Sequence, residues 1–377
     1  MKQVLIIHRE YRHRGGEDVF LDEILIPQLK KLNIDHKVIL LPSLKNPLEF
    51  LFMVLGLEKL RPSYQKVKNE TRSKDFSHVL FNNFIPTVSF ALPGFFKAQN
   101  IKTLMWVHNA RLSCANGLLF NGQTPCHRCL TTGSRWDFLQ NCHQNLMQSF
   151  LYSLVYRFNR VPKKILKNID QFVCNSQFSQ NILSSTSRHL GLPIKESVVI
   201  PMPVSMKSIS TESPTPPLHP PIAQLSKQFY LFMGRVSFEK GADIFADFAN
   251  KYPNKNFVMC GTGPMLDELQ NRKISNLIFL GHITSEKPWL YTHAQALIIP
   301  SRVAETASLV ISESRAYGTP VIYPKGGGAE ETFNSLGCTG CSLVEFKAQE
   351  FARSEPSKLA HDTENKFENQ LSKLFAN

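Results

Sequence analysis

Short apolar runs alternate with amphipathic stretches along most of the chain of 377 residues. Helical spacing of apolar positions at 19–29 and at 306–317 predicts helices between such runs. Strands that alternate with helices are typical of parallel sheets in α/β proteins. The predicted strands are 4–7, 36–41, 78–81, 103–107, 172–176 and 198–200 in the first half, then 229–233, 256–260, 277–280, 296–299 and 321–323.

The pattern is interrupted once, where residues 205–227 carry several prolines among serines and threonines. Such a composition is typical of a linker, and the chain length also favours about two domains. We therefore expect domains at 1–204 and 228–345, followed by a tail at 346–377 in which 363–375 forms a helix that crosses back to the first domain. A polar insert at 110–145 belongs to the first domain.

The composition, with 42% apolar and 19% charged residues, is that of a globular protein. A formal net charge of +13 attracts polyanions and anionic lipid. Nucleic acid is not expected, because the chain shows no helix-turn-helix, RNA-recognition or zinc-finger signature. The start becomes charged too soon for a signal peptide, and no apolar run reaches the roughly 18 residues needed to cross a bilayer. We expect a cytoplasmic protein, and an anionic membrane or a phosphorylated substrate as its partner.

Two segments suit peripheral contact with the cytoplasmic membrane face. Residues 48–57 are almost all apolar and precede a basic stretch at 59–74, and residues 148–167 combine apolar and cationic helix positions. Apolar residues beside cations suit the membrane interface. A buried core helix at 48–57 and a solvated charged face at 148–167 are the alternatives.

Two carboxylates eight positions apart, Glu305 and Glu313, flank the start of the predicted helix at 306–317. Glu305 is expected in the loop before the helix and Glu313 about two turns along it. Both then border a ligand cleft at the carboxyl end of a strand, where α/β sheets bind ligands. An ordinary surface helix with two solvated glutamates is the alternative.

Two cations, Arg235 and Lys240, straddle a turn between a predicted strand and helix. Together with a helix N-terminus they suit a diphosphate. Glycine turns at Gly261 and Gly263, at Gly326, and at Gly15 and Gly16 in the first half fit close approach to an anion. A plain strand-to-helix turn is the alternative at Gly15.

The first half supplies His108, which directly follows a predicted strand and is expected to point into a ligand cleft. The insert carries Cys114, Cys126, Cys129 and Cys142 in the spacing C-x11-C-x2-C-x12-C. Four thiolates are enough for a closed structural zinc site. His127 and His143 as substitute ligands, a redox-sensitive pair and unlinked thiols remain open.

Together these residues resemble the retaining family-4 glycosyltransferases of GT-B fold, over residues 4 to about 340. The segments that carry the resemblance are GGED at 15–18, VHN at 107–109, CNSQF at 174–178, GRVSFEKG at 234–241, CGTGP at 260–264, LGHITSEK at 280–287, IPS at 299–301, ETASLVISE at 305–313, YGTPVI at 317–322 and GGGAEE at 326–331.

The resemblance implies two Rossmann-like domains that face each other across a cleft, the first holding the acceptor and the second the donor, a nucleotide-diphosphate sugar. Arg235 and Lys240 would hold the donor diphosphate, Glu313 its ribose and Glu305 its sugar. Ser308 and Leu309 are also expected at the donor. Family members commonly carry Gly-Phe-Gly where this chain has Thr306 to Ser308, which leaves the donor sugar open.

The expected reaction is transfer of a sugar to a glycan or lipid-linked acceptor in polysaccharide building, with retention of anomeric configuration. Charge neutralisation by Arg235 and Lys240 predicts transfer without a catalytic metal. The catalytic candidates are Glu305 and His108. A GT-B sugar-nucleotide epimerase or phosphorylase and a noncatalytic nucleotide-sugar-binding subunit are the alternatives.

Overall fold

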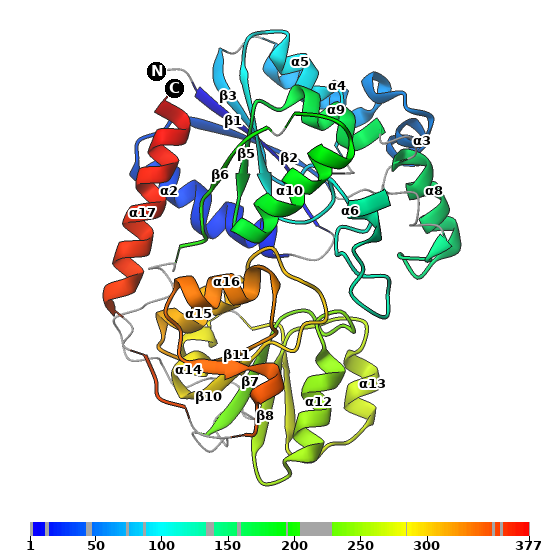
Figure 1. The fold of residues 1–377 in the computed structure, drawn as a ribbon. Coiled ribbons are helices and arrows are strands. Elements are labelled where there is room, and N and C mark those ends of the chain that lie inside the picture. The colour runs from blue at the N-terminus through cyan, green and yellow to red at the C-terminus, as the bar shows by residue number, and fades with distance from the viewer. Residues whose placement is uncertain are drawn as a thin grey trace. The chain divides into compact units, whose positions relative to one another are not determined.

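The computed structural model describes residues 3–11, 15–42, 47–72, 75–85, 88–132, 139–156, 160–193, 195–203, 228–283, 285–348, 351–354 and 357–376. The chain forms two compact units (Figure 1). Unit 1 comprises Met1–Pro201 together with Glu368–Asn377, and unit 2 comprises Met202–Phe367. The predicted proline-rich linker lies outside the described residues.

Unit 1 is built on a six-stranded parallel sheet of order β2-β1-β3-β4-β5-β6. Residues on both of its faces are buried, as in β1, because helices pack on each side. The strands are β1 Gln3–Arg9, β2 His36–Leu41, β3 Phe76–Phe81, β4 Lys102–Val107, β5 Gln171–Cys174 and β6 Glu196–Val199. Its helices are α1 Gly16–Val19, α2 Ile26–Lys31, α3 Pro47–Leu55, α4 Pro62–Thr71, α5 Leu92–Lys97, α6 Arg128–Thr132, α8 Leu146–Tyr156, α9 Arg160–Asn168 and α10 Gln177–His189, with the short helix η2 at Glu58–Leu60.

The first helical segment of unit 1 is irregular. Between α1 and α2 the backbone forms a π-helix, η1 at Phe20–Leu25. Pro27 lies two residues beyond its end and has no N–H to donate to the preceding turn, which disfavours a regular α-helix there. The ring of Phe20 lies against Trp106 and His108, with ring centroids 4.6 and 5.0 Å apart. The π-helix η1 therefore contributes a ring that packs against His108.

Unit 2 contains a second six-stranded parallel sheet, of order β12-β11-β10-β7-β8-β9. This order is that of a doubly wound nucleotide-binding sheet, with the direction of winding reversing between β7 and β10. The strands are β7 Phe229–Met233, β8 Asn256–Cys260, β9 Leu277–Gly281, β10 Ala294–Ile298, β11 Val321–Tyr323 and β12 Gly340–Ser342. The helices are α12 Ala242–Lys251, α13 Leu266–Asn271, α14 Lys287–His293, α15 Leu309–Ala316, α16 Gly327–Ser335 and η5 Leu343–Glu345, and α17 Ser357–Ala376 begins here and ends in unit 1.

The two parallel sheets confirm the predicted α/β fold class, but three details of the prediction are wrong. The helix expected at 306–317 begins only at Leu309, so Glu313 lies about one turn along it. The single helix expected at 148–167 is two helices, α8 and α9, and Pro162 near the start of α9 fits a new helix rather than a helix interior. The sequence pattern also missed β12.

Membrane crossing has no support in the helices of the described ranges. None of them combines the length and the apolar composition that a bilayer-spanning helix needs.

Candidate functional site

The best-defined polar site of unit 2 lies where the winding of its sheet reverses. Arg235 and Lys240 lie on the turn after β7, and Glu305 lies on the loop after the neighbouring strand β10. Both segments leave the carboxyl ends of parallel strands, where α/β sheets bind ligands. The fold therefore brings three of the predicted donor residues to one region of unit 2.

Arg302 ties these two segments together. Its Nη1 and Nη2 atoms donate to the two carboxylate oxygens of Asp243 at 2.6 Å each, and its guanidinium lies 3.9 Å from the ring centroid of Phe238. Burial alone would raise the pKa of Asp243, but the hydrogen bonds and the charge of Arg302, together with backbone hydrogen bonds, lower it. The backbone N–H of Arg302 also donates to the Glu239 carbonyl at 2.9 Å. The loop of Glu305 is thus fixed to the turn of Lys240.

Lys240 and Glu305 are in direct contact. Lys240 Nζ lies 2.9 Å from Glu305 Oε1, and the glutamate side chain is only 12% exposed while that of the lysine is 35% exposed. Arg235 instead pairs with Glu239, and its side chain is 58% exposed. Burial opposes ionisation of Glu239, but the Arg235 charge together with hydrogen bonds, including one from Ser237, lowers the pKa of Glu239. An anion bound here would compete with carboxylates for both cations.

Glu313 is held by two residues that sequence reasoning did not assign to the site. Lys287 Nζ lies 2.9 Å from Glu313 Oε1, and the Tyr291 hydroxyl donates to Oε2 at 2.7 Å. Burial, followed by the Glu313 charge, raises the pKa of Tyr291. Lys287 closes the motif LGHITSEK, but nothing in the spacing of that motif indicated a contact with Glu313.

The start of α15 leaves a buried hydroxyl unsatisfied. Ser308 is the N-cap residue, with extended backbone angles, and its side chain caps no backbone N–H. It is 2% exposed, and among the described residues its Oγ atom has no hydrogen-bond partner. A buried hydroxyl without a partner is costly, and the first N–H groups of a helix attract anions. The predicted donor residues Ser308 and Leu309 therefore lie where an anionic group would be stabilised.

The glycine turns of unit 2 serve backbone packing. A Cβ atom on Gly261 would overlap with the carbonyl oxygen of Gly234, and one on Gly263 would overlap with that of Val236. The last position of the glycine triplet behaves alike, because a Cβ on Gly328 would overlap with the Thr306 carbonyl. These close approaches position the cationic turn and the Glu305 loop.

A hydrogen bond between the same two segments explains the late start of α15. Gly328 N donates to the Glu305 carbonyl oxygen at 2.6 Å. The loop at Glu305 and Thr306 is therefore bonded to α16, and the helix α15 starts only after the N-cap residue Ser308.

In unit 1, a chain of buried hydrogen bonds crosses the carboxyl edge of the sheet. His8 is the last residue but one of β1, and Asn82, His108 and Asn175 follow β3, β4 and β5. Asn82 Nδ2 lies 2.9 Å from His8 Nδ1, and Asn82 Oδ1 lies 2.7 Å from His108 Nε2. Asn175 Nδ2 lies 3.3 Å from His108 Nδ1. These four side chains form one continuous network.

The two ends of this network fix the direction of every hydrogen bond in it. At one end Trp106 Nε1, which is only a donor, bonds to Asn175 Oδ1. At the other end His8 Nε2 bonds to Asp18 Oδ1 at 2.8 Å, and a carboxylate only accepts. Each amide and each ring must then donate toward Asp18, so both histidines are neutral with the proton on Nε2.

This arrangement limits what His108 can do. Burial, with a smaller effect from His8, lowers the pKa of His108 to about 3. Both ring nitrogens already take part in hydrogen bonds to Asn82 and Asn175. Transfer of a proton by His108 would require one of these bonds to break.

In the glycine turn near the N-terminus, the backbone N–H of Gly15 already has a hydrogen-bond acceptor. Gly15 N donates to Asp18 Oδ2 at 2.7 Å, so this amide is already used within the turn. Burial opposes ionisation of Asp18, but hydrogen bonds from His8 and Gly15 lower its pKa. Gly16 begins α1. Binding of a ligand by Gly15 and Gly16 stays a prediction.

Among the described residues, none of the four cysteines of the insert forms a disulfide. Cys114 and Cys129 share one small apolar cluster, and a hydrogen bond from Cys129 lowers the pKa of Cys114 to about 7. Within the ranges that the structure describes, no three His, Cys, Asp or Glu side chains are grouped as metal ligands. The zinc site with Cys126 and Cys142 stays a prediction, which metal analysis of wild type and of Cys126→Ser tests.

Residues 220–369 match the family model of glycosyl transferases group 1. Residues of this chain are 31% identical over 119 positions to 2-deoxystreptamine N-acetyl-D-glucosaminyltransferase of Niallia circulans, covering 29% of this chain and 30% of that protein. They are 36% identical over 101 positions to alpha-monoglucosyldiacylglycerol synthase of Streptococcus pneumoniae, covering 24% and 23%. The matches thus span less than a third of these curated relatives.

A similar fold is found in a solved structure, Anabaena HepE in complex with UDP and glucose. The TM-score is 0.57 at 16% identity, over 100% of this chain and 96% of that one. At this identity the likeness concerns the fold alone. The chain therefore has the two-domain GT-B fold, and the matches to residues 220–369 and to the curated relatives support a glycosyltransferase.

Proposed function

We propose that this protein transfers a sugar from a nucleotide-diphosphate sugar to a glycan or lipid-linked acceptor with retention of anomeric configuration. The observation that carries the proposal is the contact of Lys240 with Glu305 at the sheet reversal of unit 2. A cation that can hold a leaving phosphate then lies beside a carboxylate that can stabilise a cationic sugar.

The leaving diphosphate accumulates negative charge as the anomeric bond breaks. Lys240 and Arg235 would release Glu305 and Glu239 and bind the diphosphate instead. The N-terminus of α15 would contribute two further donors, the Leu309 N–H and the Ser308 hydroxyl. Preorganised donors aimed at developing charge lower the barrier of such a step. We infer that these groups neutralise the diphosphate without a catalytic metal.

The nucleoside end of the donor is assigned to Glu313. Its carboxylate, fixed by Lys287 and Tyr291, can accept hydrogen bonds from the ribose hydroxyls. Lys287, whose side chain is 30% exposed, adds positive charge near the diphosphate.

We place the acceptor-binding site in unit 1 and propose that the reaction belongs to polysaccharide building. By their names, one relative uses 2-deoxystreptamine and another makes a glucosylated diacylglycerol. Both a sugar-like and a lipid acceptor therefore occur among proteins that are similar to part of this chain. We propose a glycan or lipid-linked sugar for this chain, with His108 as the residue that contacts it.

Donor binding tests the site through Lys240. Thermal unfolding is measured with UDP-, GDP- and ADP-sugars, since a ligand at 100 times its Kd adds about 2.7 kcal/mol of stability. We expect one nucleotide series to raise the Tm of wild type and Lys251→Ala alike, because Lys251 lies at the exposed far end of α12. Lys240→Ala should weaken binding at least tenfold, and an unchanged shift would contradict the assignment.

The alternatives give different products in the same samples. An epimerase would change the donor without any acceptor, and a phosphorylase would need inorganic phosphate and a glucan. A noncatalytic subunit would bind the donor without turnover across a broad acceptor panel. Transfer only when donor and acceptor are both present is the outcome we expect.

A further inference from the structure

Exposed apolar side chains gather on one part of unit 1. Nine of the twelve large apolar side chains that are exposed in the described residues lie on two segments, around α3 and around α8. Single exposed apolar residues are ordinary, but a large contiguous group marks an interaction surface. We call this group the apolar face. It comprises Leu48, Leu51, Leu55, Leu57, Leu60, Leu139, Leu146, Met147 and Phe150.

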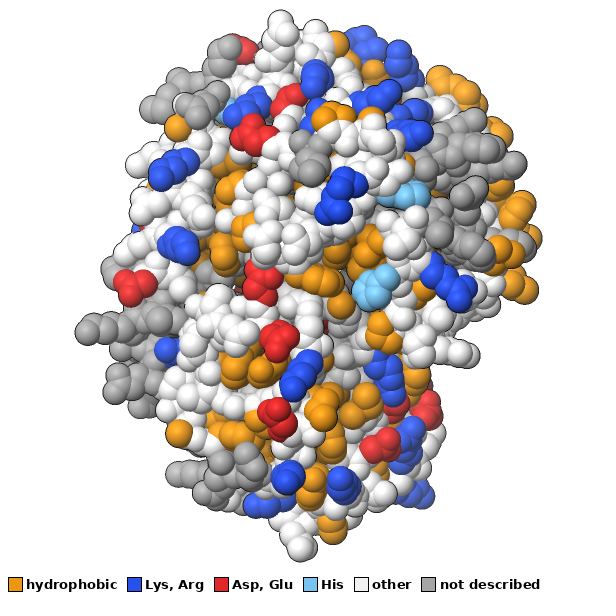
Figure 2. All heavy atoms as spheres, viewed as in Figure 1, with side chains coloured by type: hydrophobic (Ala, Val, Ile, Leu, Met, Phe, Trp, Pro, Cys, Tyr) orange, Lys and Arg blue, Asp and Glu red, His pale blue; other side chains and the backbone are white. Residues whose placement is uncertain are grey.

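The two segments of the apolar face are packed against each other. Phe50 on α3 meets Tyr152 on α8 edge to face, with ring centroids 6.3 Å apart. Met53 and Val155 are buried in the same core cluster. Leu51 and Leu55 on α3 and Met147 and Phe150 on α8 are exposed, and Figure 2 shows orange side chains along the side where Figure 1 draws α3 and α8.

Two glutamates next to the α3 side of the apolar face are buried and therefore present no charge at its surface. Glu49 and Glu58 are 2% and 6% exposed, and both are bonded to the fully buried Arg61. Arg61 Nε donates to Glu49 at 2.6 Å, and Nη1 donates to Glu58 at 3.1 Å. The backbone N–H of Phe90 also donates to Glu58 at 2.7 Å. This buried cluster anchors α3 and turns its carboxylates away from the surface.

The α8 side carries positive charge only. From Leu139 to Asn168 the sequence contains no Asp or Glu. On α9, which contacts α8, the side chains of Lys163, Lys164 and Lys167 are exposed. Figure 2 shows Lys and Arg side chains over this end of unit 1.

We propose that the apolar face docks on an anionic lipid bilayer, with the α9 lysines against the head groups. Apolar residues that enter the head-group boundary beside cations are the composition of interfacial membrane binding. The charge pattern favours this partner over a second copy of the chain, because the second copy would bring the same cations. The proposal does not depend on the proposed sugar transfer.

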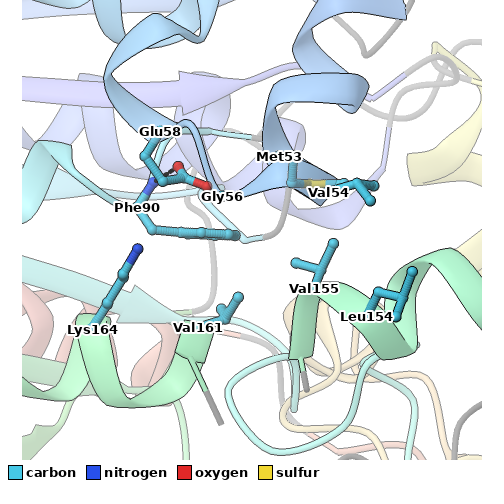
Figure 3. A pocket seen from close by; sticks show the side chains of 9 residues that line it. All are labelled: Met53, Val54, Gly56, Glu58, Phe90, Leu154, Val155, Val161 and Lys164. Atoms are coloured by element: carbon cyan, nitrogen blue, oxygen red, sulfur yellow. Dashed lines mark hydrogen bonds between the residues drawn. The ribbon is translucent and has the colours of Figure 1, made fainter. Parts of the chain in front are cut away.

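We expect lipid tails to stay outside the cavity that lies behind the apolar face. The cavity behind the face, between α3, α8 and α9, holds only about 20 Å³, close to the space of one water molecule. Figure 3 shows Met53 and Val54 opposite Val155 and Leu154, which narrow this cavity. An acyl chain does not fit there.

Co-sedimentation of the full chain with vesicles tests the proposal. The vesicles are pure phosphatidylcholine or a mixture of three parts phosphatidylcholine with one part phosphatidylglycerol. We expect at least tenfold stronger binding to the anionic vesicles, weakened by salt because exposed charges are screened. No sedimentation at low salt, or equal binding to both vesicles, would overturn the proposal.

Variants separate the apolar and cationic contributions. The triple change Leu51→Gln, Leu55→Gln, Met147→Gln and the triple change Lys163→Gln, Lys164→Gln, Lys167→Gln should each lower binding at least tenfold. Val344→Gln, at an 84% exposed position of unit 2, is the matched control and should bind like wild type. All these positions are exposed, and circular dichroism checks that each variant is folded. Wild-type binding of both triple variants, or dimers that the apolar variant loses in the absence of lipid, would overturn the assignment.

Discussion

Several residues of this protein fix the positions of the predicted site residues through hydrogen bonds. Arg302 fixes the loop of Glu305, Lys287 and Tyr291 fix Glu313, and Asp18 ends the hydrogen-bond network of His108. These supporting contacts join residues that are separated by 10 to 59 positions in the sequence. Their charges and their positions after predicted strands indicated Lys240 and Glu305 as residues of the donor site. No local pattern indicates which distant side chain will meet them.

The neutral state of His108 predicts a dependence of stability on pH. The folded protein protonates this ring at about pH 3, and the ordinary pKa of histidine is 6.5. Between these values the unfolded chain binds the proton and the folded one does not, so acid favours unfolding. The stabilisation is fully present above pH 6.5 and is lost as pH falls toward 3, by at most about 1.4 kcal/mol per pH unit.

Thermal unfolding from pH 7.5 to 5 measures this effect. We expect the Tm of wild type to fall more steeply with acidification than that of His108→Gln. His189→Gln changes an exposed histidine at the end of α10 and should keep the wild-type slope. Equal slopes for wild type and His108→Gln would show that His108 titrates normally.

Among the elements, the loop between β10 and α15 depends on α16. Gly328→Ala places a methyl group against the Thr306 carbonyl, so we expect the Glu305 loop to move and sugar transfer to fall at least tenfold. Alanine in a helix is otherwise favoured over glycine by about 1 kcal/mol. The loss would therefore come from the clash rather than from helix propensity.

A second glycine provides the comparison for this substitution. Gly94 lies in α5 of unit 1, where the nearest atoms to an added Cβ are those of Asn168 at 3.5 Å or more. Gly94→Ala should keep wild-type activity and stability. Full transfer activity in Gly328→Ala would contradict the role given to this contact.

Elements were more predictable than their ends. Continuous apolar runs located eleven of the strands, because buried parallel strands need apolar residues on both faces. The strand β12, at Gly340–Ser342, has no such run and pairs only with β11. The start of α15 also escaped prediction, since the bond from Gly328 to Glu305 outweighs the helical spacing of 306–317.

At the scale of the whole molecule, both sheets place polar residues where the winding reverses. In unit 1 this is between β1 and β3, which bear His8 and Asn82, and in unit 2 it is between β7 and β10, which lead to Lys240 and Glu305. The alternation of strands and helices predicted two such sheets. The sequence also indicated His108 and the two segments of the apolar face, at 48–57 and 148–167. It did not indicate which distant side chains meet His108 in the hydrogen-bond network.

Sugar transfer by Glu305→Gln tests the central claim most directly. Donor turnover with acceptor is followed by NMR, which also gives the anomeric configuration of the product. With the donor that stabilises wild type, we predict retained configuration and a fall in kcat of at least a hundredfold for Glu305→Gln, about 2.7 kcal/mol of barrier. Glu268→Gln, which removes an exposed partner of Arg272, should behave like wild type. Wild-type kcat in Glu305→Gln, with the fold intact, would contradict the account.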